Sequence, residues 1–198
     1  MNTRITDYQL ACSDGDYDFY AFTETWLNEN TSSKRIFGSM FNVYRLDRSP
    51  ANSDKRVGGG VLLAIHARLK SRELHPPNCS TLEQKWVEVF LANRKAFVCV
   101  IYIPPNKSSD PSIIDHHTTS LSWITSRMQL DDNIIILGDF NLPGVCWSKN
   151  LGNYLSPDSS RSSMSPTATT LLDEYSIAGL CQMNEMLNVN NRMLDLFS

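Results

Sequence analysis

The sequence predicts one α+β domain in which two mixed β-sheets pack face to face and helices cover their outer faces. Strand patterns slightly outnumber helix patterns along the 198 residues. Two strand patterns, Lys85–Leu91 and Ala96–Ile103, are separated by a short turn, and such a hairpin argues against a purely parallel sheet. The run Asn133–Leu137 holds four consecutive apolar residues, as expected of a strand that is covered on both faces.

The other elements follow from local patterns of apolar, turn and capping residues. In chain order we expect a helix from Ile5 to Cys12, a strand at Asp18–Thr23, a polar loop at 28–34, a loop at 49–55, a buried strand at 61–65 after Gly58–Gly60, a helix at Ser112–Leu130, a Ser-rich loop at 150–163, a helix at Thr167–Ala178 and short strands near Leu180–Met183 and Met193–Phe197. Ser165 and Pro166 supply the N-cap and first position of the last helix, and Gly179 ends it.

Length and composition fit a single domain spanning residues 1–198. A formal net charge of −3 lacks the basic excess of a general nucleic-acid binder, but a nuclease needs only local positive charge along one groove. No apolar stretch has the length of a membrane span, and the N-terminus lacks the apolar core of a signal peptide. We therefore expect an intracellular protein whose scattered cysteines are free thiols.

Candidate catalytic residues lie where predicted strands end. Glu24 follows one strand, Tyr102 closes another, Asp139 and Asn141 follow a third, and Asp195 lies within the final strand-like run. A Glu carboxylate suits Mg²⁺ or Mn²⁺, an Asp can orient or deprotonate water, and Tyr and Asn can donate hydrogen bonds to phosphoryl oxygens. Together these groups suit hydrolysis of a phosphate ester, although a single Asp after a strand is more often a turn or cap residue.

Three short motifs occur in a characteristic order: TETWL at 23–27, YIPP at 102–105 and GDFN at 138–141. They resemble, in order and approximate spacing, motifs of the exonuclease–endonuclease–phosphatase family. The continuation Leu142–Trp147 and the closing segment Asn191–Leu196 resemble the non-LTR retrotransposon branch of that family. The resemblance covers nearly the whole chain, and it implies a DNase I-like four-layer α/β/β/α sandwich.

The resemblance also implies a role for each candidate residue. Glu24 matches the metal-binding Glu, Tyr102 the Tyr that contacts the scissile phosphate, and Asp139 the Asp that positions or activates water. Asn141 matches the Asn that helps to hold the phosphate and the nucleophile, and Asp195 matches the Asp that orients a catalytic His. The implied activity is a Mg²⁺- or Mn²⁺-dependent endonuclease that nicks DNA in the nucleus, so that a reverse transcriptase can prime there. We expect a monomer with DNA as its partner and no membrane association.

Two further parts of the family pattern lie outside this sequence. The family opens with an Asn-bearing strand, whereas Met1 falls where the first helix begins, and its Ser-Asp-His motif would follow Asp195, whereas the chain stops at Ser198. The resemblance thus implies a sandwich that is incomplete at both termini, without the reverse transcriptase of the parent element. Because a catalytic set acts as a unit, we expect little nuclease activity from this polypeptide alone. For its four histidines we expect packing or solvation: His66, His75, His116 and His117.

Two other functions fit the same motifs. The chain is either another phosphodiesterase of this family, with RNA, an inositol phosphate or a lipid as substrate, or a non-catalytic remnant or binding module. Gly58–Gly60 is a turn that leads into a strand rather than a phosphate-binding loop, because no Gly-Lys-Ser/Thr follows. A basic DNA-facing edge or a solvated loop is expected from a group of four cations: Arg45, Arg48, Lys55 and Arg56.

Overall fold

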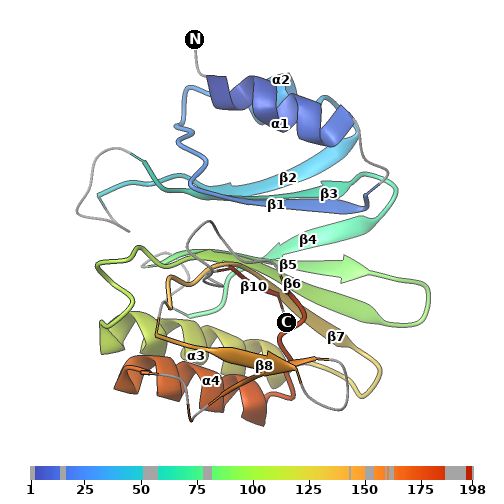
Figure 1. Ribbon diagram of the computed structural model, residues 1–198. Coiled ribbons are helices and arrows are strands. Elements are labelled where there is room, and N and C mark those ends of the chain that lie inside the picture. The colour runs from blue at the N-terminus through green and yellow to red at the C-terminus, as the bar shows by residue number, and fades with distance from the viewer. Residues whose placement is uncertain are drawn as a thin grey trace.

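The computed structural model describes residues 3–13, 17–50, 58–77, 82–142, 144–149, 154–158, 160, 163–185 and 195–197. Figure 1 shows these residues in four layers: two helices, a sheet, a second sheet and two further helices. The predicted α/β/β/α sandwich is therefore confirmed. In the part of the chain that is described, no helix is long and apolar enough to cross a membrane.

The first sheet has the strand order β1-β3-β2, and its described strands are all antiparallel. Its strands are β1 (Phe19–Thr23), β2 (Phe41–Leu46) and β3 (Val61–His66), and the helices over its outer face are α1 (Thr3–Ser13) and α2 (Ser33–Phe37). The central strand β3 buries both of its faces, with Leu62 packed in the core beneath the helices and Leu63 in the core between the sheets. This double burial explains its uninterrupted apolar sequence.

The second sheet has the order β10-β7-β6-β5-β4 and mixes both strand directions. Its strands are β4 (Lys70–Leu74), β5 (Glu83–Phe90), β6 (Lys95–Tyr102), β7 (Asn133–Asp139) and β10 (Asp195–Phe197). Strands β6 and β7 are parallel, and helix α3 (Pro111–Thr125) connects them. Parallel neighbours end at the same edge of a sheet, so Tyr102 and Asp139 are register partners. The fold thus brings two of the candidate residues side by side.

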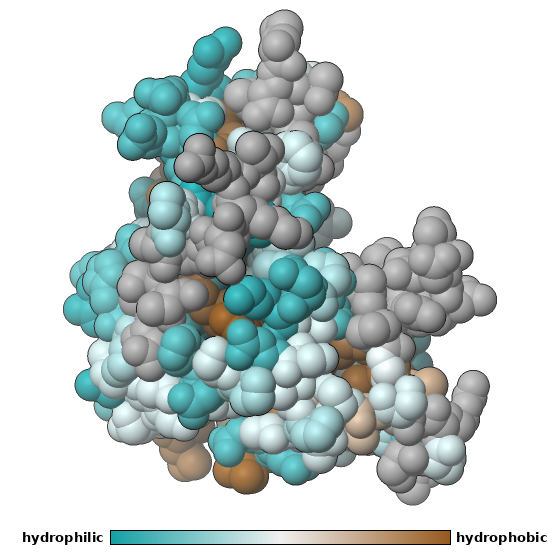
Figure 2. Space-filling model, turned by 90° about the vertical axis from the view of Figure 1, so that its left-hand side faces the viewer, coloured by the Kyte–Doolittle hydropathy of each residue, from teal (hydrophilic) through white to brown (hydrophobic). Residues whose placement is uncertain are grey.

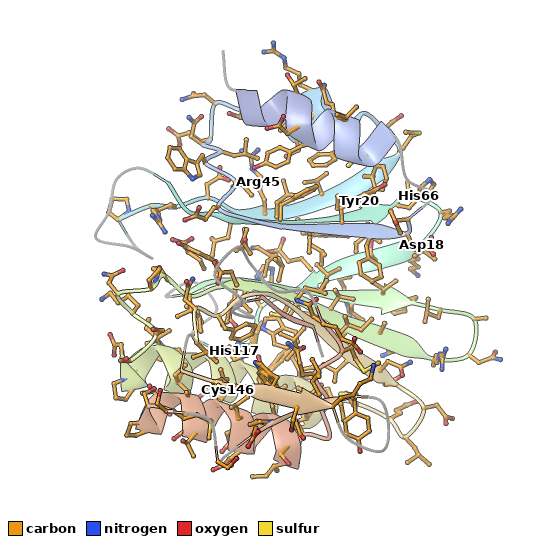
Figure 3. The ribbon with its side chains drawn as sticks, viewed as in Figure 1. Asp18, Tyr20, Arg45, His66, His117 and Cys146 are labelled. Atoms are coloured by element: carbon orange, nitrogen blue, oxygen red, sulfur yellow. The ribbon has the colours of Figure 1, made fainter. Side chains whose placement is uncertain are left out.

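Helices α3 and α4 (Pro166–Ile177) cover the outer face of the second sheet, beside a hairpin of β8 (Trp147–Lys149) and β9 (Leu155–Pro157). His117 of α3 is fully buried on the side of the helix that faces this sheet and α4 (Figure 3). Its Nδ1 is 2.9 Å from Gln84 Oε1, and its Nε2 is 2.8 Å from the Tyr175 hydroxyl. The prediction that His117 packs in the core is confirmed, and its two hydrogen bonds tie the sheet to both helices.

Several elements differ from the sequence-based expectations. Helix α2 begins within the loop expected at 28–34 and continues to Phe37, strand β9 forms within the loop expected at 150–163, and α3 ends at Thr125 rather than Leu130. The strand expected near Leu180–Met183 is only an isolated bridge between Gln182 and Leu155. Of the last expected strand, Asp195–Phe197 is described as β10, and the preceding residues 186–194 lie outside the described part of the chain.

Candidate active site

The candidate residues gather at one end of the sandwich, where β1, β6 and β7 finish. These strand ends lie on the left in Figure 1, and Figure 2 turns that side of the molecule to the viewer. Hydrophilic residues predominate across the part of this face that is drawn in colour (Figure 2). Asp18 and His66 lie at the opposite end of the first sheet, so His66 takes no part in this site (Figure 3).

A short hydrogen bond joins the two sheets at this end. The Tyr102 hydroxyl donates to Glu24 Oε1 over 2.6 Å, although the two residues are 78 positions apart in the sequence. Glu24 directly follows β1 in the first sheet, and Tyr102 is the last residue of β6 in the second. Burial, together with the neighbouring Glu24 carboxylate, raises the pKa of Tyr102 above its usual range. Tyr102 therefore keeps its hydroxyl hydrogen and remains a donor.

Asp139 and Asn141 lie beside Tyr102, at the end of β7. The Asn141 backbone N–H donates to Asp139 Oδ1 over 3.0 Å, which fixes the orientation of the carboxylate. The Asn141 side-chain amide donates to the Ile103 carbonyl over 2.9 Å, and the Ile103 N–H donates to the Asp139 carbonyl over 2.9 Å. An amide carries a second hydrogen and an oxygen, so Asn141 keeps polar groups available after binding Ile103.

The structure places only the backbone of Asp195 at this site. Asp195 pairs with Asp139 in the antiparallel register of β10 and β7. Its side chain lies outside the described part of the structure, so its role in orienting a His remains a prediction. The described residues thus bring together four of the five candidates: Glu24, Tyr102, Asp139 and Asn141.

Backbone strain concentrates at the same end of the molecule. The non-glycine residues with left-handed φ in the described ranges are Glu24 at 50°, Trp26 at 56° and Asn141 at 49°. Such conformations cost free energy and occur where the surrounding structure enforces them, often at functional sites. Here the Trp26 N–H donates to the Gly59 carbonyl over 2.9 Å, which ties the strained segment to the glycine loop.

Sequence reasoning missed a buried ion pair beneath Tyr102. Arg48 Nε donates to Glu83 Oε1 over 2.6 Å, and Glu83 Oε2 accepts from the Gly60 N–H over 2.7 Å. The Arg48 guanidinium carbon lies 5.9 Å from the centre of the Tyr102 ring. A Cβ on Gly59 would lie 2.1 Å from that guanidinium carbon, so the glycine leaves the space that Arg48 occupies. Arg48 therefore supports the Tyr102 side of the site from within the fold.

Both expectations for the cation group, a basic edge or a solvated loop, are wrong for Arg48. The side chain of Arg48 is almost completely buried, with 6% of it exposed. Arg45 pairs with Asp47 over 3.0 Å and donates to the carbonyls of Thr31 and Asn28. Lys55 and Arg56 lie outside the described residues. In the structure Glu83 is the register partner of Tyr102 in the β5–β6 pair, which places the buried ion pair next to the site.

Few carboxylates at this end of the sandwich could hold a divalent cation. Within the described ranges, no group of three or more His, Cys, Asp or Glu residues is placed to hold a metal ion. Mg²⁺, however, is commonly bound by one or two carboxylates together with water and substrate phosphate. Glu24 offers a carboxylate oxygen beside Tyr102 and is only partly buried. The residues present therefore fit a cation that substrate and water help to hold.

A two-sheet sandwich flanked by helices, with polar side chains at the strand ends, is the architecture of DNase I-like proteins. No protein-family model and no curated protein sequence matches the chain. Solved structures do match. The endonuclease domain of TRAS1, a telomere-specific non-LTR retrotransposon, is similar with a TM-score of 0.60 at 10% identity, over 100% of this chain and 79% of that one.

Two other solved structures share the architecture. The 3′-5′ exonuclease NExo from Neisseria meningitidis matches with a TM-score of 0.57 at 13% identity, over 89% of this chain and 67% of that one. The human Nocturnin catalytic domain matches with a TM-score of 0.54 at 12% identity, over 100% of this chain and 74% of that one. The fold implied by the three motifs is therefore confirmed: the chain has the fold of the exonuclease–endonuclease–phosphatase enzymes.

Proposed function

We propose that this chain is a divalent-metal-dependent phosphodiesterase that nicks DNA, as the endonuclease of a non-LTR retrotransposon does. The observation that carries the proposal is the 2.6 Å hydrogen bond between Tyr102 and Glu24. It joins the TETWL and YIPP motifs, and the register pairing of Tyr102 with Asp139 adds GDFN to the same site. The fold shared with the TRAS1 endonuclease domain supports the assignment to DNA.

Each residue has a chemical task in this proposal. Asp139 accepts a hydrogen bond from the attacking water and orients it, because its carboxylate is itself fixed by Asn141. Tyr102 and the second amide hydrogen of Asn141 donate to phosphoryl oxygens, where negative charge accumulates in the transition state. The Tyr102 hydroxyl has one hydrogen, so its donation to a phosphate replaces its donation to Glu24. Glu24 then helps to hold Mg²⁺ or Mn²⁺, which supplies Lewis-acid stabilisation when bound.

The biological setting follows from the same proposal. The substrate is nuclear DNA, and the nicked strand serves as the primer for the reverse transcriptase of the parent element. The structure of NExo that was solved with a product DNA hairpin has a TM-score of 0.50 to this chain at 14% identity. That likeness supports DNA rather than a lipid or an inositol phosphate as the first substrate to test.

Plasmid nicking tests the proposal. Supercoiled DNA records a single cut per molecule, so even a slow enzyme is measurable. We expect slow Mg²⁺-dependent nicking, in keeping with the little activity expected of this polypeptide alone; it should stop with a chelator and fall further, by up to about 100-fold, in Glu24→Gln and in Asp139→Asn. Glu29→Gln and Asp131→Asn are matched controls, because both residues are exposed, and should keep the wild-type rate.

Two results would overturn the proposal. One is nicking by the wild type that is no faster than nicking by the Glu24→Gln and Asp139→Asn variants. The other is faster Mg²⁺-dependent hydrolysis of RNA, an inositol phosphate or sphingomyelin than of DNA, which would assign the same site to a different substrate.

A further inference from the structure

The second sheet carries a group of cations at the end opposite the candidate active site. In Figure 1 the β5–β6 hairpin extends on the right beyond the region that α3 and α4 cover. Lys70, Arg72 and Lys95 surround the ring of Phe90 there, and we call these four residues the basic outer face. We propose that the basic outer face binds the phosphate backbone of a nucleic acid segment other than the one at the active site.

Side-chain alternation along β5 places Phe90 on the outer face of the sheet. Trp86 packs in the core beneath α3 and α4. Every second side chain of a strand points to the same face, so Glu88 and Phe90 follow Trp86 on the outer side. The outer face thus changes from apolar packing beneath the helices to charged and aromatic groups beyond them.

Strand register brings the cations to the same place. Lys70 is the register partner of Phe90, and Phe90 is the register partner of Lys95, so the three lie in a row across β4, β5 and β6. Arg72 is the register partner of Glu88 and lies two residues from Lys70, on the same face. Three neighbouring strands therefore each contribute to one charged surface.

Phe90 and Glu88 hold the cations in place. The Nζ atoms of Lys70 and Lys95 lie 5.2 Å and 5.8 Å from the centre of the Phe90 ring, and the guanidinium carbon of Arg72 lies 5.8 Å from it. The negative face of an aromatic ring attracts such cations. Arg72 and Lys95 also pair with Glu88, the latter over 2.9 Å. Charges that are positioned in advance lose less entropy when a partner binds.

The cations are more accessible than the acidic groups beside them. Glu88 has only 3% of its side chain exposed, so a partner meets the cations rather than this carboxylate. Asp132 is a second carboxylate near Lys95, but it accepts the backbone N–H groups of Lys95 and Gln129 over 2.8 Å and 2.9 Å. Lys70 makes no ion pair within the described part of the chain. The surface therefore attracts anions, although the whole chain has a net charge of −3.

A nucleic acid backbone is the polyanion that suits this surface. It carries one charge per nucleotide, and cations that come from three strands spaced about 4.8 Å apart can meet several phosphates at once. Binding of an acidic peptide depends on apolar anchors buried at the centre of the interface. Phe90 is a poor anchor of this kind, because three cations surround its ring.

The basic outer face lies too far from the candidate active site to hold the same nucleotides. In the β5–β6 register Tyr102 pairs with Glu83 at one end, and Lys95 pairs with Phe90 at the other. The strand from Lys95 to Tyr102 spans about 23 Å. The inference thus goes beyond the proposed function, because it adds a second nucleic-acid contact in which no catalytic residue takes part.

Fluorescence anisotropy with labelled DNA tests the proposal, with a chelator present so that no strand is cut. The double variant Lys70→Gln/Arg72→Gln removes two cations and leaves Lys95 to pair with Glu88. We expect it to bind DNA at least about fivefold more weakly, and the slope of log affinity against log salt should fall by about 1.4 for oligothymidylate or about 1.8 for a duplex. The DNA with the larger loss identifies the single strand or the duplex as the ligand.

A second double variant is the matched control. Lys34→Gln/Arg35→Gln also removes two exposed cations, but from α2 on the other side of the sandwich, and it should bind DNA as the wild type does. If Lys70→Gln/Arg72→Gln does not fold, Lys70→Gln alone, which breaks no ion pair among the described residues, should still lower the salt slope by about 0.7–0.9.

The outcomes separate this inference from the proposed function. Equal losses in the two double variants, no loss in either, or tighter binding of polyglutamate than of DNA overturn the basic outer face as a nucleic-acid contact, even where the plasmid is nicked. Weaker DNA binding in Lys70→Gln/Arg72→Gln alone, without Mg²⁺-dependent nicking by the wild type, overturns the proposed function and leaves this contact in place.

Discussion

Tyr102 and Glu24 form a hydrogen bond of 2.6 Å between the last residue of a strand in one sheet and the residue after a strand in the other. The same contact therefore belongs to the packing of the sandwich and to the candidate active site. Any change at Tyr102 should act on both, and the two effects can be separated by measuring stability and activity independently.

Tyr102→Phe removes one donor and keeps the ring. We expect Mg²⁺-dependent nicking to fall by about 10²–10³, the usual cost of losing one donor to transition-state charge. The free energy of unfolding should fall by about 1.5–3 kcal/mol, because the lost hydrogen bond goes to a carboxylate. Plasmid nicking and urea unfolding measure the two effects.

Tyr44→Phe is the matched control, because the Tyr44 hydroxyl lies 2.9 Å from Ser71 Oγ and also links the two sheets. It should lower stability by about 1 kcal/mol and leave nicking unchanged. Equal loss of nicking in both variants would show that Tyr102 acts only through the packing of the sheets.

Gly60→Ala tests the contact between the glycine loop and the segment that carries Glu24. Gly60 has a φ of 86°, and a Cβ there would lie 2.7 Å from Thr25 Oγ1. Gly38→Ala is the control, since Gly38 has a φ of 64° and nothing within 4 Å of its Cβ position. Both variants carry the left-handed backbone cost of about 1–2 kcal/mol, and Gly60→Ala adds about 1–3 kcal/mol of crowding. Urea unfolding measures the two losses of stability. If Gly60→Ala and Gly38→Ala lose the same free energy of unfolding, a Cβ at Gly60 does not crowd Thr25.

Arg48→Met leaves the buried Glu83 carboxylate without its cation. Glu83 and Arg48 have side-chain exposures of 2% and 6%, and breaking such a pair costs about 3–5 kcal/mol. Arg68→Met breaks the exposed pair with Asp18, where the exposures are 59% and 47%, and should cost no more than about 1 kcal/mol. Thermal or urea unfolding compares the stability of the two variants. A loss in Arg48→Met as small as that in Arg68→Met would refute the supporting role of the Arg48–Glu83 pair.

His117 predicts how stability depends on pH. Burial lowers the pKa of His117 from 6.5 to about 3. Below about pH 6.5 the unfolded chain therefore binds a proton that the folded chain does not bind until about pH 3. Unfolding is favoured as pH falls through this window, by up to about 1.4 kcal/mol per pH unit.

Urea unfolding at pH 7, 6 and 5 should show a steeper loss of stability in the wild type than in His117→Gln, which has no titratable group at this position. Parallel slopes for the wild type and His117→Gln would contradict the burial of a neutral His117.

Much of the sandwich was predictable because its central elements are strongly patterned. Strands β3 and β6 are almost wholly apolar where they are buried, and α4 begins at a Ser-Pro cap. Strand β4 was not predicted, because Lys70–Leu74 is mostly charged and polar and depends on pairing with β5. Its conformation is imposed by a tertiary contact that local propensity does not encode.

The candidate site likewise contains residues that the sequence identified and features that only the structure shows. Glu24, Tyr102 and Asp139 were identified because each ends or follows a recognisable strand within a motif. Arg48 was assigned to a loop, because its partner Glu83 is 35 residues away and only the packed structure joins them. Away from the site, the basic outer face was also beyond prediction, since its three cations come from strands that meet only in the fold.

The central claim is that Tyr102 and Asp139 act together in phosphodiester hydrolysis. Mg²⁺-dependent plasmid nicking by the wild type, Tyr102→Phe, Asp139→Asn and the double variant tests it most directly. Residues that act as a unit lose most of their rate in the first substitution, so the double variant should be about as slow as the slower single variant. Losses that multiply in the double variant, or a wild type without Mg²⁺-dependent nicking, would contradict the claim.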